Sequence, residues 1–388
     1  MAPRAVDGVV MAEQVALRGS SWDHPRGHAP ARETAAAYAR ASGARVSVDW
    51  VPRSLKAFGV DVVETLARDY DLILIDHPHV GTAAESGSLV PLEEYLGGDA
   101  AVLAEASPGR SFESYEYGGH LWALPVDAAC QVACWRPDLL EEPPETWEDV
   151  TRLAESGRVL WPLGDVDAAA SFLTLTAQAG HPCGEAAGAF AHRPTARWAL
   201  ELLGCVAATS DPRCRAMNPI AVLDTMASCD DVVYSPLLFG YVNYSRLDAP
   251  GRRVRFGDPP AQAGGRSGAL LGGVGIAVSS RSAQREVAVD YARFVASPEI
   301  QRGLYFDAGG QPAHASAWND PEVDRKAGGF FSGTARAMQG AWTRPRYPRF
   351  AEFQTEMIAL FGDFSTRPVD ALLDELEERY ARLYEEPG

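Results

Sequence analysis

The sequence predicts an α/β protein of two lobes, each with a mixed, mostly parallel sheet flanked by helices. The first supporting observation is length, because 388 residues exceed the size at which one hydrophobic core usually stops growing. The second is the alternation of strand-like and helix-like segments along the chain. The third is composition, since 46% hydrophobic and 22% charged residues are typical of a globular protein. No apolar run approaches the roughly 18 residues of a membrane helix.

The N-terminal part alternates between short apolar segments and segments with helical spacing of apolar residues. In chain order we expect strand 14–18, loop 19–30, helix 31–42, strand 45–50, helix 62–69 and strand 72–75. Such an alternation predicts a lobe with a largely parallel sheet.

The remaining chain carries further helical patterns and one return strand. In chain order we expect helix 168–178, helix 194–207, strand 231–234, strand 271–279, helix 287–295, helix 333–339 and helix 368–384. Crossings of the chain between two lobes would create a hinge, and a cleft at such a hinge is a preferred place for a small ligand.

Several segments, taken in order, carry a family resemblance. They are 70–76 (YDLILID), 87–92 (GSLVPL), 117–127 (YGGHLWALPVD), 134–140 (CWRPDLL), 143–150 (PPETWEDV) and 272–301 (GGVGIAVSSRSAQREVAVDYARFVASPEIQ). Together they resemble the extracellular solute-binding proteins of carbohydrate ABC transporters, the family 1 type, with a type II periplasmic-binding-protein-like fold. The resemblance spans residues 70–325.

The resemblance implies a division of the chain and a function. The first lobe would comprise residues 14–123 and 276–323, and the second lobe 124–275 and 324–388 with the C-terminal helices. Closure of the hinge would capture a small polyhydroxylated ligand, which is a sugar or a neutral or anionic sugar derivative. The permease subunits of an ABC transporter would then receive this ligand. The implied location is extracytoplasmic, either membrane-associated or periplasmic.

The N-terminus departs from this family pattern. Residues 1–7 (MAPRAVD) carry neither the apolar core of a secretory signal nor a lipoprotein cysteine. If Met1 is the native start, we therefore expect a cytoplasmic protein.

The charge of the chain limits its partners. With 35 basic and 52 acidic residues, the formal net charge is −17, which argues against nucleic acid because phosphate binding depends on positive charge. We expect a monomer whose partner is a small molecule.

Two segments, 23–29 (DHPRGHA) and 76–83 (DHPHVGTA), share the frame D-H-P-x-x-G-x-A if one residue of offset is allowed. Each follows a predicted strand, and ligands of open α/β sheets gather beyond the carboxyl ends of strands. Their imidazoles would hydrogen-bond a hydroxylated ligand, hold a metal ion, or cap loops and helices. Because spacing defines no metal geometry, we favour hydrogen bonding and expect no metal site. The candidate ligand-binding residues here are Asp23, His24, His77 and His79.

Aromatic residues form a second group of candidates. A pyranose presents apolar C–H surfaces to a ring, while its hydroxyls need directional polar partners. A place in the hydrophobic core is the commoner alternative for any single aromatic residue. The candidates, three of which come from the segment 239–244 (FGYVNY), are Trp22, Tyr241, Asn243, Tyr244 and Trp342.

Four more candidates lie near the predicted crossings or loops. Asp127 would accept hydrogen bonds from two ligand hydroxyls, or cap a helix. Gly273 would allow either the close approach of a ligand or only tight packing at the hinge. Its segment lacks the phosphate-loop pattern of nucleotide-binding proteins, so we expect no cofactor. Gln311 would form paired hydrogen bonds, and Arg344 would bind a carboxylate, sulfonate or phosphate.

An enzyme or a ligand sensor on the same fold is the alternative function. No G-x-S-x-G or H-E-x-x-H pattern occurs, yet histidines, aspartates and a cysteine gather near the predicted cleft. The catalytic candidates would be His24, His77, His79, Asp127 and Cys130. Of the six cysteines, Cys183, Cys205, Cys214 and Cys229 would pair in an oxidising compartment or remain thiols.

Overall fold

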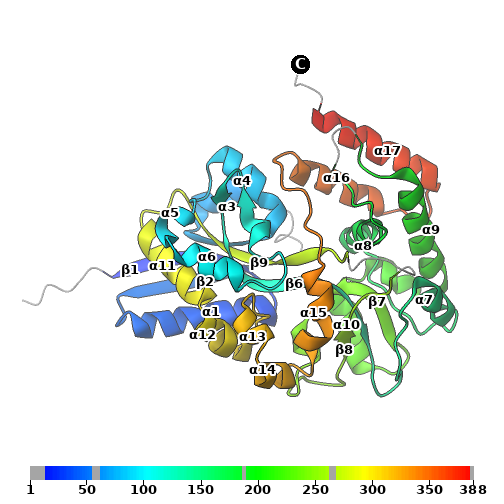
Figure 1. Ribbon diagram of the computed structural model, residues 1–388, viewed down its shortest axis with the longest axis horizontal. Coiled ribbons are helices and arrows are strands. Elements are labelled where there is room, and N and C mark those ends of the chain that lie inside the picture. Colours follow the sequence, from blue (N-terminus) through cyan, green and yellow to red (C-terminus); the bar gives the residue numbers. More distant parts are fainter. Residues whose placement is uncertain (1–13, 55–61, 186–188, 262–267, 385–388) are drawn as a thin grey trace, which may run out of the picture.

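The computed structural model describes residues 14–54, 62–185, 189–261 and 268–384. Its main sheet has the order β2-β1-β3-β9-β6-β7, with β8 also paired to β6 (Figure 1). The strands are β1 (Val15–Trp22), β2 (Val46–Arg53), β3 (Leu72–Ile75), β6 (Leu124–Trp135), β7 (Tyr234–Phe239), β8 (Arg255–Gly257) and β9 (Leu271–Val278). A separate small sheet pairs β4 (Glu116–Tyr117) with β5 (His120–Leu121).

The helices surround both ends of this sheet. They are α1 (Pro25–Ala41), α3 (Val63–Asp69), α4 (Val80–Ser86), α5 (Glu93–Leu96), α6 (Asp99–Glu105), α7 (Trp147–Ala154), α8 (Asp165–Gln178), α9 (Arg193–Thr209), α10 (Pro219–Ser228), α11 (Arg285–Ala296), α12 (Pro298–Ile300), α13 (Ala315–Trp318), α14 (Pro321–Lys326), α15 (Phe330–Gln339), α16 (Phe350–Phe361) and α17 (Val369–Ala381). Figure 1 shows α1, α3, α4, α5, α6 and α11 on one side of the molecule, and α7, α8, α9, α16 and α17 on the other.

The sheet is mixed, and its parallel part is smaller than the sequence analysis predicted. Among the named strands of the described residues, β1 pairs in parallel with β2 and β3, whereas β9 is antiparallel to both β3 and β6. The long strand β6 is also antiparallel to β7 and β8. The chain runs out through β6 and back through β9, which explains why the strands in the middle of the sheet oppose one another.

Two separate hydrophobic cores lie on either side of the point where these strands pass. Val126 and Val274 pack in the first core, while Ala128 and Leu271 pack in the second. The strands β6 and β9 therefore each contribute to both cores. A third crossing lies between Tyr305 of the first core and Phe306 of the second.

The domain boundaries expected from the sequence remain a proposal. Within the stretch 276–323, which we expected in the first lobe, the side chains of Phe306, Ala313, Ala317 and Val323 pack in the second core. A boundary at residue 305 would therefore follow the packing of the side chains more closely.

The predicted loop 19–30 is wrong, because β1 continues to Trp22 and α1 begins at Pro25. The predicted helix 31–42 is confirmed as the later part of α1, which starts six residues before it. The His24 side chain caps this helix, with its Nδ1 atom accepting a hydrogen bond from the Arg26 backbone N–H at 3.0 Å. Pro25 suits the first helical position because it needs no backbone donor there. The frame D-H-P therefore marks a helix start.

Another predicted strand is displaced along the chain. We expected a strand at 231–234, whereas β7 begins at Tyr234 and continues to Phe239. The apolar run after Tyr234 is buried and pairs with β6, so tertiary burial determines where the strand lies.

Candidate ligand-binding cavity

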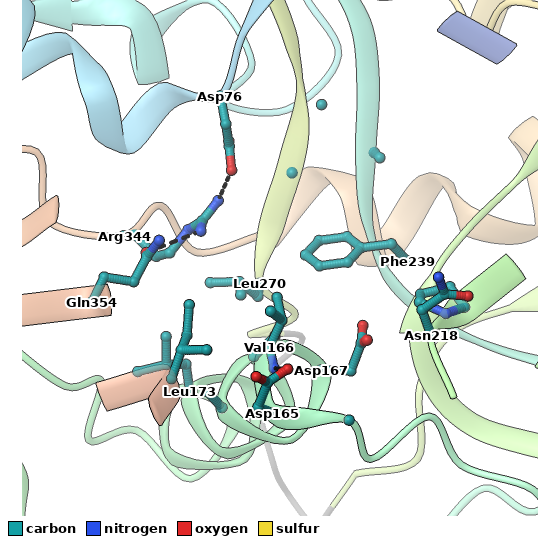
Figure 2. Close-up of a pocket in the computed structure, with 18 of the residues that line it drawn as sticks. Asp76, Asp165, Val166, Asp167, Leu173, Asn218, Phe239, Leu270, Arg344 and Gln354 are labelled. Atoms are coloured by element: carbon teal, nitrogen blue, oxygen red, sulfur yellow. Dashed lines mark hydrogen bonds and ion pairs between the residues drawn. The ribbon is translucent and has the colours of Figure 1, made fainter. Parts of the chain in front are cut away.

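A cavity of about 440 Å³ lies beside the strand crossings and is lined from both cores (Figure 2). Trp22, Arg26 and Asp76 come from the first-lobe elements β1, α1 and the end of β3. Residues 272–274 of β9 supply the hinge side. Side chains on the opposite wall come from β7 and helices α8 and α16, including Asp165, Val166, Asp167, Leu173, Phe239, Gln354 and Met357.

The first residues of α8 form part of this wall. Gly164 is the N-cap and has no side chain to occupy the position, while the apolar residues from Ala168 onward are buried in the second core. Asp165 and Asp167 stand in the first turn, where negative charge is favourable because the N–H groups of a helix start carry partial positive charge. The helix thus places two carboxylates at the cavity.

The two carboxylates differ in environment. Asp165 is exposed and accepts a hydrogen bond from the Val166 backbone N–H at 2.9 Å. Asp167 is 8% exposed, and burial raises its pKa well above the usual value, with a smaller contribution from Asp165. Figure 2 shows the Asp167 carboxyl group projecting into the cavity on the side of Phe239.

Arg26 and Asp127 form a buried ion pair at the cavity. Arg26 Nε donates to Asp127 Oδ2 at 2.8 Å, and Arg26 Nη2 donates to Asp127 Oδ1 at 2.5 Å. Arg26 Nη1 also donates to the Gly240 carbonyl at 2.7 Å, and the guanidinium lies 4.6 Å from the centre of the Tyr241 ring. Arg26 therefore connects α1 with β6 and with the segment after β7.

Arg344 and Asp76 form a second ion pair in the lining. Arg344 Nη2 donates to Asp76 Oδ2 at 2.6 Å, while Arg344 Nη1 donates to Gln354 Oε1 at 3.1 Å (Figure 2). Burial alone would raise the pKa of Asp76, but the charges of Arg344 and His77 outweigh it and lower that pKa. Among the described residues, the buried Arg344 Nε has no hydrogen-bond partner.

Gly273 sits where the backbones of β6 and β9 approach each other most closely. Its φ is +120°, a conformation that residues with a side chain rarely adopt, and a Cβ there would lie 2.3 Å from the Asp127 carbonyl oxygen. The register between β6 and β9 shifts at the same place, between Pro125 and Asp127. Glycine is thus required by the strand crossing.

Comparisons with known proteins agree with this architecture. The family model for bacterial extracellular solute-binding proteins matches residues 35–207. The chain is 23% identical over 334 residues to the maltotriose-binding protein of Pyrococcus abyssi, covering 80% of this chain and 69% of that protein. Two solved structures share the fold. T. maritima MalE3 with maltose bound has a TM-score of 0.82 at 17% identity and covers 95% of this chain and 100% of its own. A solute-binding protein from Agrobacterium radiobacter K84 in complex with ribitol has a TM-score of 0.79 at 18% identity, with 96% and 100% covered.

Residues 35–207 of the chain thus match the family of bacterial extracellular solute-binding proteins.

Four of the predicted ligand-binding residues line the cavity. They are Trp22, Tyr241, Gly273 and Arg344. Their roles in binding stay predictions, but all four lie around one cavity, as we expect of residues that bind the same ligand.

The other predicted polar and aromatic residues lie outside the lining, and most already have partners in the protein. Both carboxylate oxygens of Asp127 are held by Arg26. Gln311 accepts from the Val242 N–H and donates to the Ala128 carbonyl, and it joins the cavity-side strand to the segment after β7. The side chains of Asn243, Tyr244 and Trp342 donate to the Gly309 carbonyl, to Asp224 and to Glu185, respectively.

From the two histidine segments, 23–29 and 76–83, the residues in the lining are Arg26 and Asp76, and the histidines lie outside it. Asp23 is exposed, and His24 stacks edge-on against Tyr241 with ring centres 5.0 Å apart. His77 is fully buried in the short helix His77–His79, where Asp76 caps the chain. His79 is partly buried in the same turn. In the described part of the chain, no group of three histidine, cysteine, aspartate or glutamate side chains could hold a metal ion.

None of the five residues named for the enzyme alternative lines the cavity. Burial lowers the pKa of His77 to about 4. The pKa of His24 is also lowered to about 4, mainly by burial and to a smaller extent by the charge of Arg26. Burial raises the pKa of the Cys130 thiol, which disfavours the nucleophilic thiolate. All six cysteines are free thiols, four of them buried.

Several cavity residues escaped the sequence analysis. Arg26 lies in the segment 23–29, between His24 and His28, and its position there gave no sign of the ion pair that it forms. Asp165 and Asp167 directly precede the predicted helix 168–178, and a pair of acidic residues at a helix start was the signal for them. Phe239 carried no signal beyond its place next to Tyr241.

Proposed function

We propose that this protein captures a small polyhydroxylated ligand, a sugar or a polyol, by closure of its two lobes and delivers it to an ABC importer. One observation carries the proposal: a cavity of about 440 Å³ at the strand crossings, lined from both cores. This volume lies in the usual range of about 300–1,000 Å³ for small-molecule sites. A ligand that contacts both lobes favours the closed arrangement because it binds that arrangement better.

The chemistry of the lining suits such a ligand. Trp22, Phe239 and Tyr241 offer aromatic surface for the apolar face of a sugar ring. The carboxyl group of Asp167 offers a hydrogen-bonding partner for hydroxyl groups. The relatives named above bind maltotriose, maltose and ribitol, which share a polyhydroxylated character.

The proposal extends to partners and location. As an importer component, the protein would work outside the cytoplasm, in the periplasm or at the membrane surface, and would dock on permease subunits as a monomer. None of the helices in the described ranges combines the length and apolar character that a membrane span requires.

The test is a binding panel of neutral mono- and oligosaccharides and polyols, measured by thermal denaturation and then by calorimetry. A ligand at 100 times its dissociation constant stabilises the folded protein by about 2.7 kcal/mol, which shifts the melting temperature measurably. We expect a shift with one class of neutral ligand and recovery of that ligand unchanged.

A matched pair of variants locates the site. Phe239→Ala should weaken binding at least tenfold because it removes the ring on the cavity wall. Tyr95→Ala removes an exposed ring from α5, outside the cavity, and should leave the affinity unchanged. The absence of binding across the panel, or chemical turnover of the bound sugar, would contradict the proposal.

A further inference from the structure

The cations of the cavity are already matched by carboxylates of the protein. Arg26 is paired with Asp127, and Arg344 is paired with Asp76. An anionic ligand would therefore bring a charge that no free cation in the described lining balances. The acidic sugar derivative that Arg344 suggested from the sequence loses its main support.

The acidic side of the cavity is different, because its charge is not matched. Among the described residues, no hydrogen bond or ion pair involves the Asp167 carboxyl group, although it is 8% exposed and faces the cavity. Asp165 lies two residues earlier in α8 and adds a second carboxylate to the same wall. A buried carboxyl group without a partner is unfavourable, which makes it a place where a ligand group adds binding energy.

The start of α8 by itself explains only part of this arrangement. Asp165 accepts a hydrogen bond from Val166 and is exposed, as expected of a residue that stabilises a helix terminus. Asp167 makes no such bond, and it points away from the helix into the space beside Phe239 (Figure 2). Its orientation therefore calls for a partner in the cavity.

We propose that the preferred ligand is a polyhydroxylated molecule carrying a protonated amine, with the amine bound at Asp167. The inference rests on the proposed function and names the ligand class within it. A hydrogen bond between an ammonium group and a carboxylate is shorter and stronger than one between neutral groups. The ring of the ligand would rest on Phe239. Amino sugars have this combination of groups.

The experiment measures calorimetric affinities for a matched set: glucose, its 2-, 3- and 6-amino-deoxy forms, and glucuronic acid. We expect at least one amino form to bind at least tenfold more tightly than glucose, and glucuronic acid to bind more weakly than glucose. Asp167→Asn keeps the shape of the side chain and removes its charge. It should weaken binding of that amino form at least tenfold, and by a larger factor than it weakens glucose binding.

The control is Asp49→Asn, which removes the same charge from an exposed position on β2, outside the cavity. It should leave the preference for the amino form intact, and circular dichroism confirms folding of both variants. If neutral sugars bind and no amino form binds more tightly, the charge inference is wrong while the proposed function stands. Equal losses for glucose and the amino form in Asp167→Asn would lead to the same conclusion. If neither this set nor the neutral panel binds, both proposals fail.

Discussion

Arg26 and Asp127 meet in a doubly hydrogen-bonded ion pair at the point where β6 passes from one hydrophobic core to the other. Val126 packs in the first core and Ala128 in the second, so Asp127 stands between them. Arg26 also reaches the Gly240 carbonyl beside the second core. The first-lobe helix α1 is thereby attached to the hinge.

Loss of Arg26 should destabilise the protein strongly. Arg26→Met leaves the Asp127 carboxylate buried without its partner, and breaking a buried pair in this way costs about 3–5 kcal/mol. Urea denaturation should show this as a lower midpoint. The double variant Arg26→Met/Asp127→Asn, which removes the stranded charge, should recover part of the loss. An unchanged midpoint for the single variant would show that the pair does not hold the hinge.

Gly273 should tolerate no side chain. Gly273→Ala combines an unfavourable φ of +120° with a Cβ placed 2.3 Å from the Asp127 carbonyl oxygen. Backbone strain of this kind alone costs about 1–3 kcal/mol, and the contact adds to it. Gly157→Ala is the matched control, because its φ of +72° is also positive but its Cβ meets nothing within 4 Å. A comparison of unfolding free energies should show the larger loss at Gly273, and equal losses would contradict the account of the crossing.

Asp167 should make the free protein less stable as the pH rises. Its pKa is raised in the folded state, so the folded protein holds a proton that the unfolded chain releases at lower pH. Its favourable contribution is complete below the unfolded pKa near 3.8 and is lost as the pH rises toward the folded value. Asp167→Asn should therefore raise the melting temperature at pH 7 more than at pH 4. An equal change at both pH values would exclude this linkage.

His77 should have the opposite effect. Its pKa falls from 6.5 to about 4 because burial disfavours the charged ring, so its contribution is present above pH 6.5 and is lost as the pH falls toward 4. For a shift of this size the loss is on the order of 3 kcal/mol. His77→Gln should flatten the decline of the unfolding free energy between pH 7 and pH 4. The exposed residue His120 supplies the control His120→Gln, for which the decline should persist.

Local patterns in the sequence predicted many of the elements but not all their limits. The helical spacing around 287–295 agrees with α11, and the apolar run 72–75 is the strand β3. The sequence does not reveal the start of α1, because prolines such as Pro25 and Pro30 are typical of loops, whereas the His24 cap makes Pro25 a helix start. Such a cap depends on side-chain geometry that spacing does not reveal.

In the candidate site, the residues that the sequence predicted are clearly distinct from the contacts that only the structure reveals. Sequence alone determined the α/β class, the family resemblance and the cavity residues Trp22, Tyr241, Gly273 and Arg344, because these rest on short-range patterns and residue chemistry. Only the tertiary structure decided which charges meet. Arg26 and Asp127 are 101 positions apart, and Asp76 and Arg344 are 268 apart. Pairing at such separations depends on how the two cores pack around β6 and β9, so the charged groups that remain for a ligand emerge only after folding.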